Sequence, residues 1–339
     1  MLDVAFKLKT AEPLMAKGQT VAYRQMAVRE VKPTMQPIQP MEGNLKVKTD
    51  RKQNTLTVTD NDGLEVVFGK TTGLMGKYRV GGVDMLGEGG QMLPNFWRAV
   101  TDNDMGAQLH RKFKAWRNPD MSLKAISSKK MSNSVVRVST VFDMPSVQST
   151  LKIDYTVHAN GVIDVVQSLA TTKGAEVGAP LRYGMLMELP YEMDKSEFYG
   201  RGPIENYVDR KESQMVGIYE QTADEQFYPY IRPQETGTKS DIRWWKQRAA
   251  SGKGFCVTAD GLFSASALHY GIAELDEGDD KGQRHAPELH KSKYTELCLD
   301  LAQFGLGGEN SWGAWPLPQH RLGYKDMTFK FRITPLSAQ

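Results

Sequence analysis

The amino-acid sequence predicts an all-β protein, built as a large antiparallel sandwich or barrel. Segments that alternate apolar and polar residues recur along most of the 339-residue chain, and turns rich in glycine separate them. No amphipathic stretch is long enough for a substantial helix, although "DMGAQLHRKFKAW" at residues 104–116 has the composition of a short one. Many strands at short spacing with few helices are typical of all-β domains.

The expected strands follow one another along the chain. Alternation predicts strands within residues 3–10, 19–31, 54–68, 134–144, 149–170 and 327–336. Two of these segments contain a turn signal, Asn61-Asp62-Gly63 in the third and Asn160-Gly161 in the fifth, so each is expected to form a hairpin.

One domain boundary is visible near the N-terminus. Residues 31–45 are rich in proline and show little periodicity, so we interpret them as a linker or covering segment. Only about two strands precede them, which is too few for a stable sandwich. We therefore expect residues 1–30 to be the C-terminal strands of an incomplete domain, and residues 46–339 to form the large sandwich.

Composition excludes several classes of function. The formal charge of +3 is nearly balanced and no run of five like charges occurs, which argues against a nucleic-acid surface. No eighteen apolar residues run together, and the N-terminus lacks a signal-peptide core, so any export signal would lie upstream and the compartment stays open. Cys256 and Cys298 have no CxxC spacing; we interpret them as ordinary buried thiols, with a disulfide or a reactive thiol as alternatives.

Four stretches combine carboxylates, amides and arginines with aromatic residues. They are "FWRAVTDNDMG" at 96–106, "FYGRGPIENYVDRK" at 198–211, "YPYIRPQETGTKSDIRWW" at 228–245 and "LGGENSWGAW" at 306–315. Polar side chains packed between aromatics are costly unless they satisfy one another or a polar ligand. Sugars suit this chemistry, because their hydroxyls hydrogen-bond to such side chains while the C–H face of the ring lies on an aromatic ring.

The candidate sugar-binding residues all come from three of these stretches. They are Arg98, Asp102, Asn103, Asp104, Gly106, Glu235, Asn310 and Trp312. Trp312 is the strongest candidate, because glycines and polar residues flank it on both sides, whereas we interpret Trp315 as a packing residue.

A structural interpretation of the same motifs remains open. Arginine and carboxylate pairs often serve only to tie loops together, which is the favoured interpretation of "YGRGPIENYVDR", and "TDNDMG" also fits a capped turn. The histidines have no ligand spacing, so no metal site is expected. The acidic run at residues 274–290 is expected to be a solvated loop.

These motifs, in this order, resemble the C-terminal β-sandwich of family 2 β-galactosidases from about residue 45 to the end. "GQTVAYRQMAVRE" at residues 18–30 is similar to the last strands of the immunoglobulin-like domain that precedes this sandwich in the family. The resemblance implies a galactose mutarotase-like fold, with Trp312 as an aromatic platform for the sugar and the segment around Gly106 as a mobile loop. Where the family often has proline, this chain has Val100.

The resemblance also implies where the chemistry lies. Both catalytic glutamates of the retaining mechanism belong to an upstream TIM barrel, so no catalytic residue is expected in this segment. No cofactor is expected here either, although full-length members can use Mg or Na ions. The implied partners are a β-galactoside and the preceding domains of the same protein, and a homo-oligomer stays open. The alternatives are a free carbohydrate-binding module and an aldose-1-epimerase-like enzyme with Glu235 as base and His269 as acid.

Overall fold

The computed structural model describes residues 1–29, 32–39, 41–276, 278–279, 282, 284–310 and 313–336. Strands dominate these residues, and the longest helix, α1 (Asp102–Gly106), has five residues. The all-β prediction is confirmed. The short helical stretch is confirmed as well, since α1 is followed by α2 (Leu109–Lys112) and by a 3₁₀ turn at Lys114–Trp116. No helix in the described part of the chain has the length and apolar character to cross a bilayer.

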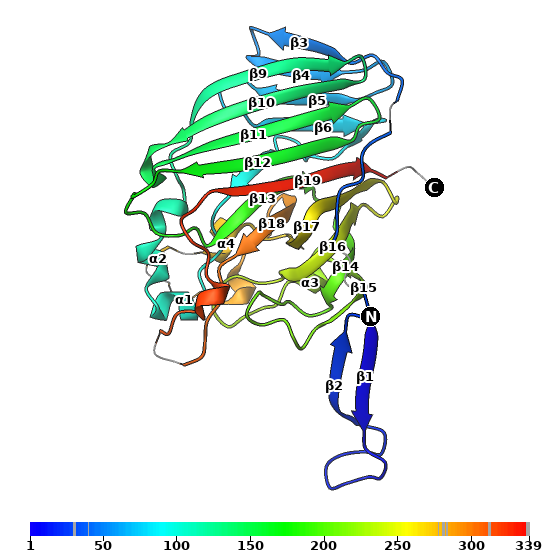
Figure 1. The fold of residues 1–339 in the computed structure, drawn as a ribbon, viewed down its shortest axis with the longest axis vertical. Coiled ribbons are helices and arrows are strands. Elements are labelled where there is room, and N and C mark those ends of the chain that lie inside the picture. Colours follow the sequence, from blue (N-terminus) through cyan, green and yellow to red (C-terminus); the bar gives the residue numbers. More distant parts are fainter. Residues whose placement is uncertain are drawn as a thin grey trace.

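Antiparallel pairing joins most strands into two stacked layers (Figure 1). The first layer runs in the order β9 (Ser122–Ser132), β10 (Val135–Met144), β11 (Ser149–His158), β12 (Ile163–Thr171) and β19 (Met327–Pro335). The second layer runs in the order β3 (Lys46–Asp50), β4 (Thr55–Thr59), β5 (Glu65–Gly69), β6 (Met75–Val80), β8 (Met92–Asn95), β13 (Arg182–Pro190) and β18 (Tyr294–Gln303), with β7 (Val83–Asp84) folded back on β6. The predicted hairpins appear as β4–β5 and β11–β12.

The two layers are joined by one long strand, β17 (Gly254–Leu268). Its first part, Phe255–Ala259, pairs with β19, and its last part, Ser264–Leu268, pairs with β18. On its other side β17 pairs with β16 (Lys239–Arg248), which continues to β14 (Lys195–Gly202) and β15 (Met215–Thr222). The register of β16 shifts near Asp241, whose positive φ of 54° marks the bend between the two parts of the strand.

The core fills the space between the layers. Strands such as β4 and β10 alternate buried and accessible residues, because one face of each sheet packs inward and the other meets solvent. Phe68 of β5 and Tyr155 of β11 pack with ring centroids 5.1 Å apart, and the Tyr78 hydroxyl of β6 donates to the Gly161 carbonyl in the β11–β12 turn at 2.7 Å. These contacts fix the two layers face to face.

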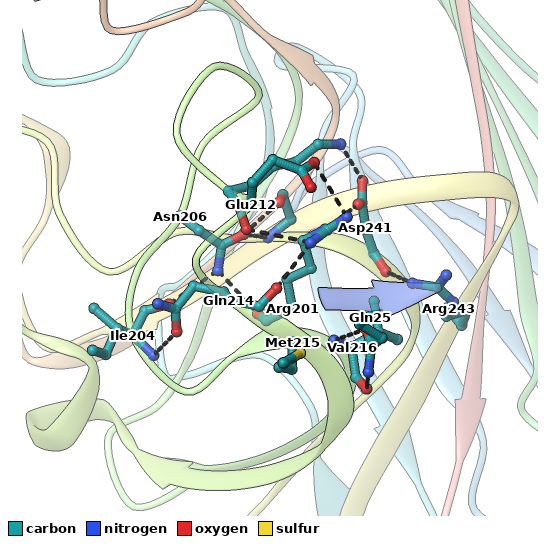
Figure 2. Close-up of polar contacts among 12 residues, drawn as sticks. Gln25, Arg201, Ile204, Asn206, Glu212, Gln214, Met215, Val216, Asp241 and Arg243 are labelled. Carbon is teal, nitrogen blue, oxygen red and sulfur yellow. Dashed lines mark hydrogen bonds and ion pairs between the residues drawn. The ribbon is translucent and has the colours of Figure 1, made fainter. Parts of the chain in front are cut away.

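The N-terminal residues form a separate two-stranded sheet, β1 (Leu2–Lys7) and β2 (Thr20–Met26), which projects from the sandwich (Figure 1). Gln25 is one of its attachments to the body, since its side chain bonds both the N–H and the carbonyl of Val216 in β15, at 2.7 and 3.0 Å (Figure 2). The Tyr23 hydroxyl also donates to the Ser213 carbonyl at 2.9 Å. The proline-rich segment then follows the body, since Pro33 accepts a hydrogen bond from the Gly261 N–H at 2.8 Å.

The remaining helical turns lie in the loops that connect these strands. They are α3 (Ala223–Gln226), α4 (Ile272–Leu275) and 3₁₀ turns at Pro145–Val147, Ala286–Glu288 and Pro318–His320. One expectation about this region is wrong: the acidic run is not simply a solvated loop. Asp276 is 4% exposed, because its carboxylate accepts from the Trp97 indole at 2.7 Å and pairs with Arg117 at 3.2 Å.

Candidate functional site

The four polar motifs, far apart in the sequence, converge around one loop, residues 304–316. Gly313 of this loop packs on α1, because a β-carbon on Gly313 would overlap the carbonyl of Gly106. Asn103 lies against the same loop, since a β-carbon on Gly308 would stand 2.7 Å from the Asn103 amide nitrogen. The first and fourth motifs therefore share a glycine-lined contact in which the two backbones approach closely. Asn103 and Gly106 are exposed beside it.

A buried ion pair holds this contact in place. Arg98 is fully buried, and its Nη2 lies 2.8 Å from Asp104 Oδ1. The same guanidinium donates to the carbonyls of Phe304 and Gly305, the latter at 3.1 Å. Asp104 in turn caps α1, accepting from the Thr101 N–H at 2.9 Å while its own N–H bonds the Thr101 hydroxyl. The pair thus anchors both α1 and the loop.

The first and third motifs are joined at the surface. The Asp102 carboxylate accepts from Arg232 and from the Gln234 amide, both at 3.2 Å. The Asp102 N–H completes a reciprocal bond to the Gln234 side-chain oxygen at 3.3 Å. Asp102 is exposed, so these groups are accessible to a polar ligand.

The second and fourth motifs meet through Asp209, which sequence reasoning did not select. Its Oδ2 accepts from the Gly307 N–H at 2.9 Å. Its Oδ1 is buried without a hydrogen-bond partner among the described residues. A β-carbon on Gly305 would stand 2.5 Å from the same carboxylate, so the glycine lets the loop approach. The glycines at 305 and 307 in "FGLGG" were the signal that a carboxylate approaches the backbone here.

Glu235 lies beneath the motif cluster, 5% exposed, in a charged group that includes Arg182 and Asp300. Arg182 Nη2 donates to Glu235 Oε1 at 2.8 Å, and its Nε lies 3.2 Å from Asp300 Oδ2. Burial opposes the charge on Arg182, but the two carboxylates outweigh it and raise the Arg182 pKa. Burial raises the pKa of Asp300 to about 7. No sequence pattern marked Arg182 or Asp300, because neither lies in one of the four polar motifs.

The second motif ties loops together. Arg201 donates to Asp241 at 2.6 Å and to the Gln214 carbonyl at 2.8 Å, and Lys211 also donates to Asp241 at 2.8 Å (Figure 2). Burial opposes the charge on Asp241, but the hydrogen bonds from Lys211 and Arg201 outweigh it and hold the Asp241 pKa below its ordinary value. These contacts stabilise the bend in β16 at which Asp241 adopts its positive φ.

Glu205, a second carboxylate in this motif, likewise holds loops together, here those of the third motif. Glu205 accepts from Arg210 at 2.8 Å, from the hydroxyls of Tyr230 and Thr236, and from the Gly237 N–H at 2.8 Å. Burial and the hydrogen bond to Glu205 raise the pKa of Tyr230. Glu205 therefore joins the second motif to the third.

The fourth motif supplied two predicted residues, Asn310 and Trp312. Asn310 is exposed, and its side-chain oxygen accepts from the Ala314 N–H at 3.2 Å. Trp312, the strongest candidate, lies outside the described residues. Trp315 is the packing residue that the sequence predicted: its ring makes edge contacts with Phe113 and Phe304, at centroid distances of 5.7 and 6.2 Å.

The structure separates the predicted residues into two groups by exposure. Asp102, Asn103, Gly106 and Asn310 reach the surface, whereas Arg98, Asp104 and Glu235 are buried and bonded to the chain. The buried three hold the loops, a distinction that the sequence motifs did not contain. No group of three or more metal-ligating side chains occurs among the described residues.

The proposed epimerase pair finds no support in this geometry. Glu235 is bonded to Arg182 and to the Thr238 hydroxyl at 2.8 Å. His269 instead lies near the Tyr294 carbonyl, at 3.5 Å, and stacks on Tyr191. Glu235 lines a small cavity with Arg182 and Thr236, and His269 is not among the residues of that cavity.

Known proteins resemble this chain in sequence. Residues 60–333 match the family model described as "Beta galactosidase small chain". Over 339 residues the chain is 30% identical to a β-galactosidase of Priestia megaterium, covering 99% of this chain and 31% of that protein. It is 35% identical over 280 residues to a β-galactosidase of Lactobacillus delbrueckii subsp. bulgaricus, covering 80% of this chain and 26% of that one. The chain thus spans about a third or less of these relatives.

The fold has a structural counterpart as well. The crystal structure of galactose 1-epimerase from Lactobacillus acidophilus NCFM superposes with a TM-score of 0.50 at 10% identity, covering 88% of this chain and all of that one. At this identity the likeness concerns the fold alone, and it confirms the mutarotase-like sandwich.

Proposed function

The chain belongs to the β-galactosidase small-chain family, and we propose that it is the C-terminal portion of a retaining β-galactosidase that hydrolyses terminal non-reducing β-D-galactose residues. In this proposal the segment completes the sugar pocket, while the catalytic glutamates belong to a barrel in the preceding domains. The observation that supports it most is the convergence of the four motifs on the loop at 304–316.

The exposed residues of the cluster would meet the sugar. Asp102, Asn103 and Asn310 offer carboxylate and amide groups to sugar hydroxyls, and Trp312 would supply the aromatic surface for the ring. Gly106 would let the loop backbone come close to the ligand. A polar surface of this kind, with Trp312 close to it in the sequence, suits a neutral hydroxyl-rich molecule.

The buried residues would act as positioning residues. Arg98 and Asp104 fix α1 against the loop, and Glu235 fixes the third motif, since its N–H also bonds the Ala99 carbonyl at 3.2 Å. A retaining glycosidase needs two free carboxyl groups about 5 Å apart. In the described cluster the carboxylates of Asp104 and Glu235 are engaged by arginine, so we assign binding and positioning to this segment, and bond cleavage to the preceding domains.

The experiment that tests this proposal is hydrolysis of a chromogenic β-galactoside. The chain is assayed alone, and then after mixing with the separately expressed preceding domains of the full-length enzyme. We expect activity only in the mixture, because each part holds one half of the site. Activity in the chain alone would overturn the assignment of catalysis to the preceding domains. A mixture no more active than the preceding domains by themselves would overturn the role in completing the pocket.

Two experiments on the isolated chain test the alternative functions. Titration of the isolated chain with lactose tests a free binding module, which requires saturable binding without the preceding domains. Polarimetry of α-galactose tests an epimerase, which requires the chain to accelerate mutarotation above the buffer rate.

A further inference from the structure

A cavity lies away from the motif cluster. Arg182, at the start of β13, contacts Glu235, whereas Pro190, at the other end of this nine-residue strand, lines the cavity. At about 3.3 Å per residue the two ends are roughly 26 Å apart. The cavity has a volume of about 960 Å³, at the upper end of the range of roughly 300 to 1,000 Å³ of small-molecule sites. Its walls are Gly76, Lys77, Asp84, Leu86, Gly87, Glu88, Gly89, Pro190, Tyr191, Glu192, Lys293 and Tyr294.

Tyr191 gives this cavity a fixed aromatic surface. One face of its ring stacks on His269, with centroids 3.9 Å apart and an interplanar angle of 10°. His269 is buried, yet Tyr191 is 40% exposed, so the stacking leaves Tyr191 accessible to a ligand. The Tyr191 carbonyl also accepts from the Thr295 hydroxyl at 2.8 Å, which holds the backbone. The ring is therefore oriented before any ligand arrives, and ordering it on binding costs little entropy.

Gly76 leaves one wall of the cavity bare. It is the extra residue of a bulge between β5 and β6, where Val67 pairs with Lys77 and Phe68 with Met75. Its φ is not in the left-handed region, and no atom lies within 4 Å of the position of a β-carbon. Neither the backbone conformation nor packing requires a glycine at position 76, and glycine weakens a strand. One reason to find a glycine within a strand is the close approach of a ligand.

The charged groups on the walls are of both signs. Lys77 pairs with Glu65 at 2.6 Å, and Asp84 pairs with Arg79 at 2.9 Å. The carboxylates of Glu88 and Glu192 have no hydrogen-bond or ion-pair partner among the described residues, and both residues are exposed, as is Lys293. Free carboxylates disfavour an anion, and the charged walls disfavour an apolar ligand. A neutral molecule with many hydroxyls can donate to the carboxylates and accept from the ammonium groups.

We propose that this cavity binds a neutral oligosaccharide, with Tyr191 as the surface for one sugar ring and the strand at Gly76, which carries no side chain at that position, as another part of the wall. The site is distinct from the motif cluster, since none of the residues predicted for that cluster lines it. Its volume favours an oligosaccharide over a single sugar.

The test is calorimetric titration of the chain with β-1,4-galactotetraose. We expect saturable binding that Tyr191→Ala weakens about tenfold, from lost ring area and stacking. The control is Tyr23→Ala, which removes a tyrosine of similar exposure, 48%, on the N-terminal hairpin, and is expected to leave the affinity unchanged.

A second variant tests the same cavity by filling it. Gly76→Leu should preserve the melting temperature, because its β-carbon meets open space, and should abolish binding in the cavity. Its control is Gly323→Leu, a glycine with ordinary φ whose β-carbon would meet only the Lys325 side chain at 4.0 Å. Wild-type affinity in Gly76→Leu, or no binding of the tetraose to the unaltered chain, would overturn the proposal. Because no hydrolysis is measured, the outcome does not depend on the function proposed above.

Discussion

Gly313 packs on the carbonyl group of Gly106, and this contact joins the loop at 304–316 to α1. Gly313 has a φ of +80°, and a β-carbon on it would overlap the Gly106 carbonyl oxygen. Two separate requirements, conformation and space, therefore demand glycine at position 313. Substitution of Gly313 therefore tests how much the contact between the loop and α1 contributes to stability.

Gly313→Ala is expected to destabilise the chain by more than the cost of positive φ alone, which is about 1 kcal/mol. The matched control is Gly252→Ala, because Gly252 has nearly the same φ, +79°, and no atom within 4 Å of its β-carbon position. Urea unfolding of both variants measures the difference. Equal losses of unfolding free energy in the two variants would show that the contact with Gly106 contributes nothing to stability.

Arg98→Met is expected to lower the free energy of unfolding by roughly 3 to 5 kcal/mol, because it leaves the Asp104 carboxylate buried without its counter-charge. The control is Arg79→Met, whose pair with Asp84 is about 40% exposed on both sides. Exposed pairs contribute about 0 to 1 kcal/mol, so that variant should be nearly neutral. Chemical denaturation compares the two, and similar losses would contradict the role of burial.

Asp300 is expected to make stability depend on pH below neutrality. Burial raises its pKa from 3.8 to about 7, so the folded state binds a proton that the unfolded state releases between these values. The corresponding stability is complete below about pH 4 and is lost as the pH rises to about 7. Relative to Asp300→Asn, the unaltered chain should therefore lose stability across this range. A difference that stays constant with pH, measured by denaturation at several pH values, would refute the assignment.

Lys239 is expected to make stability increase with pH in the alkaline range, whereas Asp300 makes it decrease at lower pH. Burial lowers its pKa from 10.5 to about 8, and its ammonium donates to the Gly237 carbonyl at 2.8 Å. A lowered pKa in the folded state means that stability rises as the pH increases from about 8 to 10.5. Lys239→Met should remove this rise, which amounts to about 3 kcal/mol. Melting temperatures of both proteins between pH 7.5 and 10.5 check it, and parallel curves would exclude Lys239 as the source.

Trp312→Ala in the full-length enzyme is expected to weaken binding at the leaving-group side of the sugar by about 1 to 3 kcal/mol, from lost ring area and stacking. Steady-state hydrolysis of lactose measures the change. Trp315→Ala is the control, because its ring packs on Phe113 and Phe304 and should affect stability first. Unchanged kinetics in Trp312→Ala would contradict the role of Trp312 as an aromatic platform for the sugar.

Sequence reasoning found the strands that face solvent on one side. Strands such as β4 and β10 show the two-residue alternation that a half-buried strand requires, and β11–β12 carries an Asn-Gly turn. It did not delimit β13 or β17, because the alternation is lost where consecutive residues are buried, at the start of β13 (182–185) and at the end of β17 (265–268). It also read Asp276 as solvated, since a carboxylate in an acidic run gives no sign of a distant tryptophan partner.

The sequence by itself determined the fold class, the family resemblance and the four polar motifs, because alternation, turn residues and motif order are local properties of the chain. Only the tertiary structure decided which motif residues face outward. Asp102 and Asp104 are two positions apart in one short helix, yet the first is exposed and the second pairs with buried Arg98. The reason is physical: burial and hydrogen-bond partners depend on segments that folding brings together, such as the Phe304 and Gly305 carbonyls at Arg98 and the Gly307 N–H at Asp209.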